Sequence, residues 1–228
     1  RNLLSRPQHE VNVNEVQDGK TPLFIACENG SIEIVQLLLS RYDIDINRRC
    51  TKETREKMKR EEMTALQAAI DIDNFEIVQH LLAAPNIDVN IKYMEQKKDE
   101  TKEKTALLMA VKKENIPIVR LLLSRPNIDV NIKSIKRSND KNEETTALNI
   151  AADKKNYQIA ELLLQRPNID TNIKTIKKTN DKYSEMTALH IAVDKKCIEI
   201  VRLLLGRPEI DVNIKYHKKS SKKLKEKT

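Results

Sequence analysis

Hydrophobic residues recur along the chain in evenly spaced blocks that share one internal order. Each block opens with a threonine, and Leu, Ala and Ile or Val follow on one helical face, as Leu189, Ala192 and Val193 do. A polar break comes next, and then a second apolar stretch such as Ile198–Leu205, which in most blocks stops just before a proline. The pattern predicts two short helices per block, folded back on each other.

The blocks form a repeat, because five of them align without gaps. Their opening threonines, each suited to cap a helix N-terminus, are Thr21, Thr64, Thr105, Thr146 and Thr187. Helices this short are unstable alone, so the pairs must bury their apolar faces against neighbouring pairs. We therefore expect one solenoid domain over 1–228, with a partial repeat and hairpin in 1–20 and repeats in 21–63, 64–104, 105–145, 146–186 and 187–228.

The start of each block resembles the ankyrin-repeat family, whose motif begins Thr-Pro-Leu-His-x-Ala. Thr21-Pro22-Leu23 and Thr187-Ala188-Leu189-His190 match it most closely. The resemblance implies an all-α repeat solenoid, in which stacked helix-turn-helix pairs are joined by extended β-hairpin loops. At the end of the first helix, the glycine of the family remains only as Gly30, and other units have Asp73, Glu114, Lys155 and Lys196. Residues 3–14 match the close of a unit and Thr228 stands where the next opening is due, so we expect a longer array, cut at both ends.

The units are longer than the family's roughly 33 residues, and the extra residues fall before each opening threonine. Apolar residues alternate there, as in Ile87, Val89, Ile91 and Tyr93 or Ile210, Val212, Ile214 and Tyr216, which predicts strands. Asn139-Asp140 and Asn180-Asp181 are suitable turn residues. We expect long hairpin fingers with frayed tips. For residues 48–63, which lack the alternation, a hairpin, a short exposed helix and a disordered loop all stay open.

The formal net charge of +8 lies in these insertions, since Lys and Arg outnumber Asp and Glu in each of them. A basic edge of this kind steers acidic partners in a salt-sensitive way. The alternative is electrostatic binding of nucleic acid or an anionic membrane surface by the lysine-rich fingers. Against it, acids are interleaved with the lysines, and few aromatics, only Tyr93, Tyr183 and Tyr216, are placed to stack on bases.

The resemblance to ankyrin repeats implies a scaffold or adaptor that binds protein partners across the first helices and the fingers, as a monomer. By position in the motif, the residues expected to face or border that groove are Lys20, Glu28, Asn29, Lys104, Lys112, Lys113, Asp153, Lys154, Asp194 and Lys195.

Other chemistry is weakly supported. Gly19-Lys20-Thr21 ends like a phosphate-binding P-loop, but Asn14 stands where that loop needs a glycine. His190 is expected to bond within the scaffold, and Cys27 and Cys197 have no histidine near them in sequence to activate them. We expect no catalysis, cofactor, metal or small-molecule substrate. The odd cysteine count and the absence of a signal-peptide pattern favour a reducing, cytoplasmic location, with the nucleus as the alternative.

Overall fold

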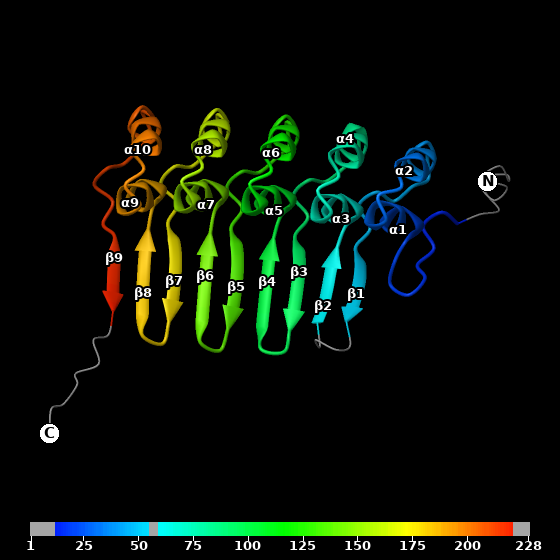
Figure 1. Ribbon diagram of the computed structural model, residues 1–228, viewed down its shortest axis with the longest axis horizontal. Helices are drawn as coiled ribbons and strands as arrows, with labels where there is room; N and C mark the ends of the chain where they lie inside the picture. The colour runs from blue at the N-terminus through cyan, green and yellow to red at the C-terminus, as the bar shows by residue number, and fades with distance from the viewer. Residues whose placement is uncertain (1–11, 55–58, 221–228) are drawn as a thin grey trace, which may run out of the picture.

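The computed structural model describes residues 12–54 and 59–220. Within them, helices occur in pairs, stacked side by side in two layers (Figure 1). The inner helices are α1 (Pro22–Glu28), α3 (Ala65–Asp71), α5 (Ala106–Lys113), α7 (Ala147–Lys154) and α9 (Ala188–Asp194). The outer helices are α2 (Ile32–Leu39), α4 (Phe75–Ala83), α6 (Ile116–Leu123), α8 (Tyr157–Leu164) and α10 (Ile198–Leu205). No described helix is both long enough and apolar enough to cross a membrane.

Each inner helix starts where its threonine side chain accepts a backbone hydrogen bond from the residue three positions on, as Thr105 does from Leu108. The helix then stops at a residue in the left-handed conformation, which is Gly30, Asp73, Glu114, Lys155 or Lys196. A non-glycine residue costs roughly 1–2 kcal/mol there. The next residue offsets this cost, because its N–H bonds back into the helix, as Asn115 N does to the Ala110 carbonyl.

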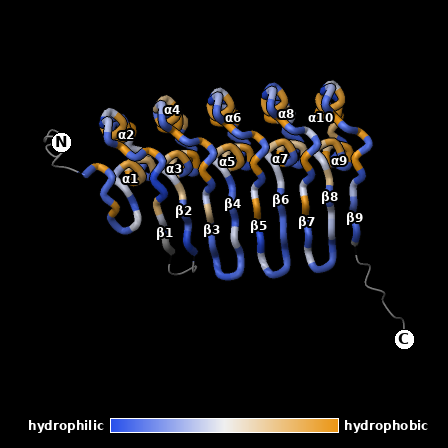
Figure 2. The backbone as a smooth tube through the Cα atoms, turned by 180° about the vertical axis from the view of Figure 1, so that it is seen from behind, coloured by the Kyte–Doolittle hydropathy of each residue, from blue (hydrophilic) through white to orange (hydrophobic). Residues whose placement is uncertain are grey.

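The core runs the length of the stack and is almost wholly aliphatic. The same positions of successive outer helices are fully buried, including Leu81, Leu122, Leu163 and Leu204, each 0% exposed. Their contacts reach both neighbouring units, since α6 packs on α4 and on α8. Figure 2 shows the result, with hydrophobic positions concentrated in the helices and hydrophilic ones along the fingers. Most of the hydrophobic stabilisation therefore lies at the boundaries between units.

An asparagine near the end of each unit joins it to the next. The Asn131 side chain donates to the Asn168 carbonyl at 2.8 Å and accepts from the Asp170 backbone N–H at 2.9 Å. Asn14, Asn47, Asn90 and Asn172 bond in the same way. Two hydrogen bonds per asparagine fix the spacing of the units at the roots of the fingers.

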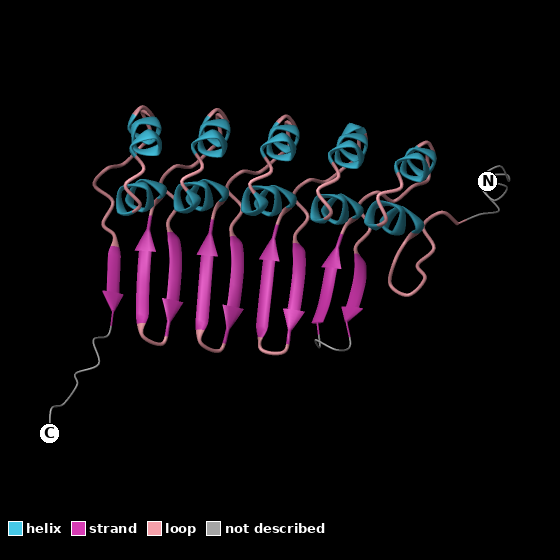
Figure 3. Cartoon of the chain, in the orientation of Figure 1, coloured by secondary structure: helices cyan, strands magenta, loops and turns pink. Residues whose placement is uncertain are grey.

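The fingers form one antiparallel sheet, in which every strand pairs with the next along the chain (Figure 3). Its strands are β1 (Cys50–Thr54), β2 (Lys59–Met63), β3 (Tyr93–Lys97), β4 (Glu100–Lys104), β5 (Ser134–Ser138), β6 (Lys141–Thr145), β7 (Thr175–Thr179), β8 (Lys182–Met186) and β9 (His217–Ser220). Because adjacent fingers also pair, for example Lys102 with Lys136 and Glu143 with Lys177, the expected all-α class is wrong in its strand content. An isolated hairpin is marginally stable in water, and pairing with its neighbours removes that weakness.

One further expectation about the fingers is corrected. Ile87 and Val89 are buried, but they lie before the strand, in a segment turned by the hydrogen bond from Asn90 N to the Asp88 carboxylate, and β3 starts only at Tyr93. Strand pairing reaches Lys97 and Glu100 in the second finger and ends at Lys178 and Tyr183 in the fourth, so fraying of the tips stays a prediction.

The conformation left open for 48–63 is a hairpin in its described part. β1 and β2 pair from Cys50 opposite Met63 outward, and both of these side chains are buried against the helices. The tip of this finger, residues 55–58, lies outside the described residues, as do residues 1–11 and 221–228.

Candidate partner-binding groove

One face of the sheet turns towards the last turns of the inner helices, and we call it the groove face. Side chains of directly paired residues point to the same side of a sheet, and they alternate along each strand. The register therefore places one row of side chains across the middle of this face: Lys52, Glu61, Glu95, Lys102, Lys136, Glu143, Lys177, Ser184 and Lys218. Lys52, Lys177 and Lys218 reach carboxylates on inner helices, which fixes the orientation of the face.

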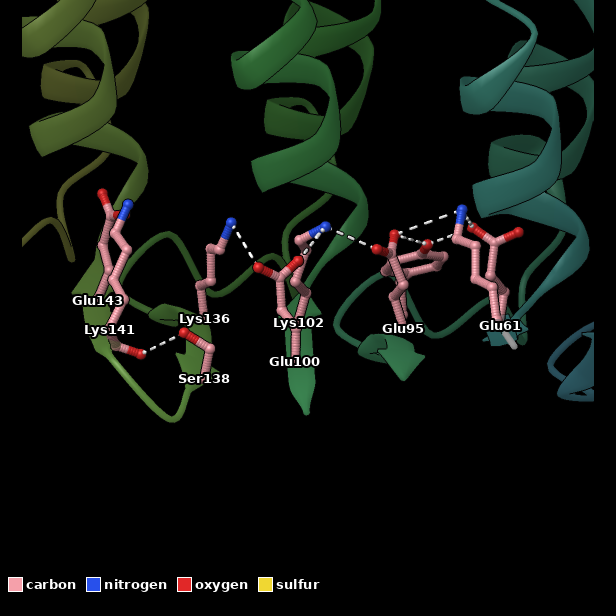
Figure 4. A network of polar contacts seen from close by, with 10 residues as sticks. Glu61, Glu95, Glu100, Lys102, Lys136, Ser138, Lys141 and Glu143 are labelled. Carbon is pink, nitrogen blue, oxygen red and sulfur yellow. Dashed lines mark hydrogen bonds and ion pairs between the residues drawn. The ribbon is translucent and has the colours of Figure 1, made fainter. Parts of the chain in front are cut away.

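Charges of both signs occur along this row, and they form ion pairs across strands (Figure 4). Lys102 contacts Glu95 at 2.6 Å and Glu100 at 2.8 Å, and Lys136 contacts Glu100 from the next finger at 2.8 Å. Further along, Lys177 lies 3.5 Å from Glu143. Single exposed pairs contribute little, but a connected network holds neighbouring fingers in register.

The ion pairs and hydrogen bonds of this network shift the pKa values of its members. Hydrogen bonds from Lys102 and Lys136 lower the pKa of Glu100 to about 2. Burial raises the pKa of Tyr93, and its hydroxyl donates to Glu61 at 2.5 Å and to Glu95 at 2.8 Å, which raises it further. The groove face is thus a surface of paired charges, in which the acids that the sequence interleaves with the finger lysines hold those lysines in place.

Three of the predicted groove residues are acids that hold the fingers to the helices. Glu28 accepts from Lys20 at 2.5 Å and from Lys52 at 2.8 Å. Asp194 pairs with Lys218 at 2.9 Å. Asp153 receives Lys195 at 2.9 Å and Lys177 at 3.7 Å. These carboxylates lie at the floor of the groove, and each already has a partner within the chain.

Three predicted lysines at the ends of the inner helices connect neighbouring units. Lys113 donates to the Asp73 carboxylate at 2.9 Å, and Lys154 pairs with Glu114 at 2.7 Å, in both cases across a repeat boundary. Lys195 makes its bridge to Asp153 in the same direction. Since they hold adjacent units together, their first role is structural, and a partner reaches them only in competition with these bonds.

The remaining predicted residues have freer side chains. Asn29 is exposed at the C-terminal cap of α1. Lys104 is half-buried, with its ammonium 4.6 Å from the centre of the Tyr93 ring, and Lys112 donates to the Ser134 hydroxyl at 2.9 Å. Neither lysine forms an ion pair with a described residue.

The sequence analysis did not single out the acids of the middle row, Glu95 and Glu143 among them, or their neighbour Glu100. A signal was present, because Lys52, Lys136, Lys177 and Lys218 each stand at the same distance after the closing asparagine of their unit. This regular spacing places the lysines in one row only if neighbouring fingers pair with each other. The sequence analysis expected separate hairpins, so it did not predict the row.

Residues considered for other chemistry take scaffold positions. Asp18 and Gly19 form the turn of a small hairpin closed by Gln17 and Lys20, so Gly19-Lys20-Thr21 is not a phosphate loop. His190 completes the cap of α9, where its Nδ1 lies 2.7 Å from the Thr187 hydroxyl. Burial raises the pKa of Cys27 to about 12, which keeps the thiol protonated at neutral pH.

Comparisons with solved structures agree with this architecture. The crystal structure of the ankyrin repeat protein EF0377 aligns with a TM-score of 0.61 and 26% identity over 90% of this chain and 89% of its own. The ankyrin repeat domain of Bcl-3, a member of the IkappaB protein family, aligns with a TM-score of 0.56 and 20% identity over 83% of this chain and 72% of its own. At that identity, the second match shows the fold alone.

Curated relatives match over a shorter stretch. BRCA1-associated RING domain protein 1 of Caenorhabditis elegans is 38% identical over 81 residues, 36% of this chain. Alpha-latroinsectotoxin-Lt1a of Latrodectus tredecimguttatus is 37% identical over 79 residues, 35% of this chain. The match spans only 10% and 5% of their respective lengths. A model of ankyrin repeats in three copies matches residues 1–93, 50–134, 92–175 and 132–216. The chain therefore belongs to the ankyrin-repeat family, whose members are typically non-catalytic modules for protein–protein interaction.

Proposed function

We propose that this segment is a scaffold or adaptor that holds protein partners in the groove between the inner helices and the groove face. The supporting observation is the continuous sheet. It lies next to the ends of the inner helices and forms one side of the groove, on which the charged side chains are held by ion pairs. Because the groove face carries fixed charges of both signs, it favours a partner whose own charges are complementary to it. A generic polyanion binds less well, since its negative charges would also meet the carboxylates of the face.

The alternative, electrostatic binding of nucleic acid or an anionic membrane, receives less support. Groove lysines such as Lys102, Lys136 and Lys177 are already paired with carboxylates, and a phosphate backbone would have to displace them. We also propose a reducing, cytoplasmic location. The chain's three cysteines are free thiols, all buried, and that state suits a reducing compartment.

The proposal is tested by reversing charge on one face of the sheet at a time. Lys97 and Lys182 lie on the groove face, are exposed and form no ion pair among the described residues. Changing both to glutamate is expected to reduce capture of proteins from cell lysate on the order of tenfold at physiological salt, because like charges then face an acidic partner. Quantitative mass spectrometry of the captured proteins measures the loss.

The matched control is Lys178→Glu with Lys219→Glu, which makes the same charge change on the opposite face of the same sheet. It should leave capture unchanged. Equal loss with both variants, or capture of nucleic acid or lipid in place of proteins, would contradict the proposed function.

A further inference from the structure

Ion pairs between inner helices and fingers follow one arrangement in three of the five units. The last turn of the inner helix carries an acid in four units, Glu28, Asp71, Asp153 and Asp194, and a lysine, Lys112, in the third. Opposite Glu28, Asp153 and Asp194, the lysines Lys52, Lys177 and Lys218 complete the pairs at 2.8, 3.7 and 2.9 Å. The second unit has two acids at these positions, Asp71 and Glu95. The third unit has two cations, Lys112 and Lys136, and Lys112 forms no ion pair with a described residue.

The surroundings of Lys112 add more positive charge. Lys136 on β5 is the register partner of Lys102 on β4, and both ammonium groups form ion pairs with the Glu100 carboxylate. Lys104 stands on the same face, over the Tyr93 ring. Burial and the charge of Lys104 lower the pKa of Lys112 while Glu143 opposes the shift, and together these effects bring the pKa to about 8.

Lys112 remains open to solvent despite this crowding. The residue as a whole is exposed, and it borders a depression of about 180 Å³ that is also lined by Thr145, Asn149 and Thr175. Lys112 donates to a neutral hydroxyl, that of Ser134, where Glu28, Asp153 and Asp194 of other units pair with a lysine. Glu143 and Asp153 also line the depression, but they pair with Lys141, Lys177 and Lys195. The site therefore has donors, space and access, and among the described residues no carboxylate pairs with Lys112.

A lysine near a helix C-terminus also interacts favourably with the helix dipole. However, α1, α3, α7 and α9 form the same helix with an acid at that position. A cation is thus not needed for the fold, and its placement next to three other lysines works against stability.

We propose that Lys112 and Lys104 bind a glutamate or aspartate side chain of a protein partner, which supplies the carboxylate that α5 lacks at this position. This inference rests on the proposed function, because it places the anchor of a partner in the groove. Carboxylate is favoured because the chain itself uses one at this position in every other unit. The partner segment would lie across the groove at α5, with its acid directed at the ammonium of Lys112 and the hydroxyl of Ser134.

The test uses capped peptides as probes: one alternating Glu and Ser, its Gln analogue and its phosphoserine analogue. Lysine side-chain NMR signals of the chain are followed during titration at physiological salt. The Glu peptide is expected to shift Lys112 and Lys104 more than any other lysine, and the Gln peptide should shift neither. Lys112→Met should weaken Glu-peptide binding on the order of tenfold, as expected for one lost charged hydrogen bond.

Lys155→Met is the control, since Lys155 is an exposed lysine beside an inner helix with no side-chain bond recorded among the described residues. It should bind the Glu peptide as the unmodified chain does. Unchanged binding by Lys112→Met would overturn the inference, and so would tighter binding of the phosphoserine peptide.

Failure of this inference is distinguishable from failure of the proposed function. If Lys112→Met binds the peptide normally while the Lys97→Glu and Lys182→Glu variant loses lysate capture, the groove function stands and the anchor is wrong. If the peptide binds at Lys112 while that variant keeps full capture, the anion site stands and the proposed groove function fails.

Discussion

Replacing Leu122 with alanine is expected to lower the free energy of unfolding by about 2–5 kcal/mol, the range for truncating a buried leucine. Leu122 is 0% exposed and lies in α6, which packs on both α4 and α8. The cavity would open at the boundary between units, where most of the hydrophobic stabilisation is located. Urea unfolding followed by circular dichroism measures the change.

Arg120→Ala, in the same helix but exposed and without an ion pair among the described residues, is the control. Such surface changes usually stay within about 0.5 kcal/mol. A loss at Leu122 no larger than that at Arg120 would show that the stacked interface does not carry the stability.

Deleting residues 105–145 is expected to leave a folded, shorter solenoid with one helix pair and one finger fewer. The deletion joins Lys104 to Thr146, which has the same place in its unit as Thr105. β4 can then pair with β7 as it does with β5, and α3 can stack on α7 as it does on α5. Helical content per residue should remain the same, and size-exclusion chromatography should show a compact particle.

Deleting 105–125 is the matched negative control. It removes α5 and α6 but keeps their finger, so β5 and β6 lose the helices on which they rest. This shorter deletion should be far more damaging than the longer one, with aggregation or loss of cooperative unfolding. The opposite order of stability would contradict a solenoid built from nearest-neighbour contacts.

The helical half of the fold was predictable because each of its determinants is local. Thr105 caps its helix, and the apolar spacing of Ile118 and Leu122 defines one buried face. Even the left-handed stop at Glu114 follows from the alignment with Gly30, although the residue type argues against it.

The sheet was not predictable in the same way, because pairing between fingers is a property of the stacked array. Lys102 and Lys136 are separated by a whole helix pair, and neither flanking sequence specifies that they become register partners. In 48–63 the strands carry charged residues on both faces, so no alternation of apolar and polar residues marks them. Only the buried ends, Cys50 and Met63, show which side meets the helices.

Motif position located the helix ends of the candidate site but not their contacts. Glu28, Asp153 and Asp194 lie at those helix ends, paired with lysines, and their role in binding a partner stays a prediction. That same reasoning could not separate Lys112, which has no ion pair with a described residue, from Lys113, which bridges to Asp73. The distinction depends on what lies across from each side chain, which only the assembled fingers provide.

Photo-crosslinking from one face of the sheet and then from the other tests the proposed groove most directly. Gln96 and Lys97 are adjacent exposed residues of β3 whose side chains point to opposite faces of the sheet. A benzoylphenylalanine placed at each position in turn, in the otherwise unmodified chain, reports which face touches a partner in lysate. The account predicts protein crosslinks from position 97 and few from position 96; crosslinks mainly from position 96 would place the partner on the back of the sheet and contradict it.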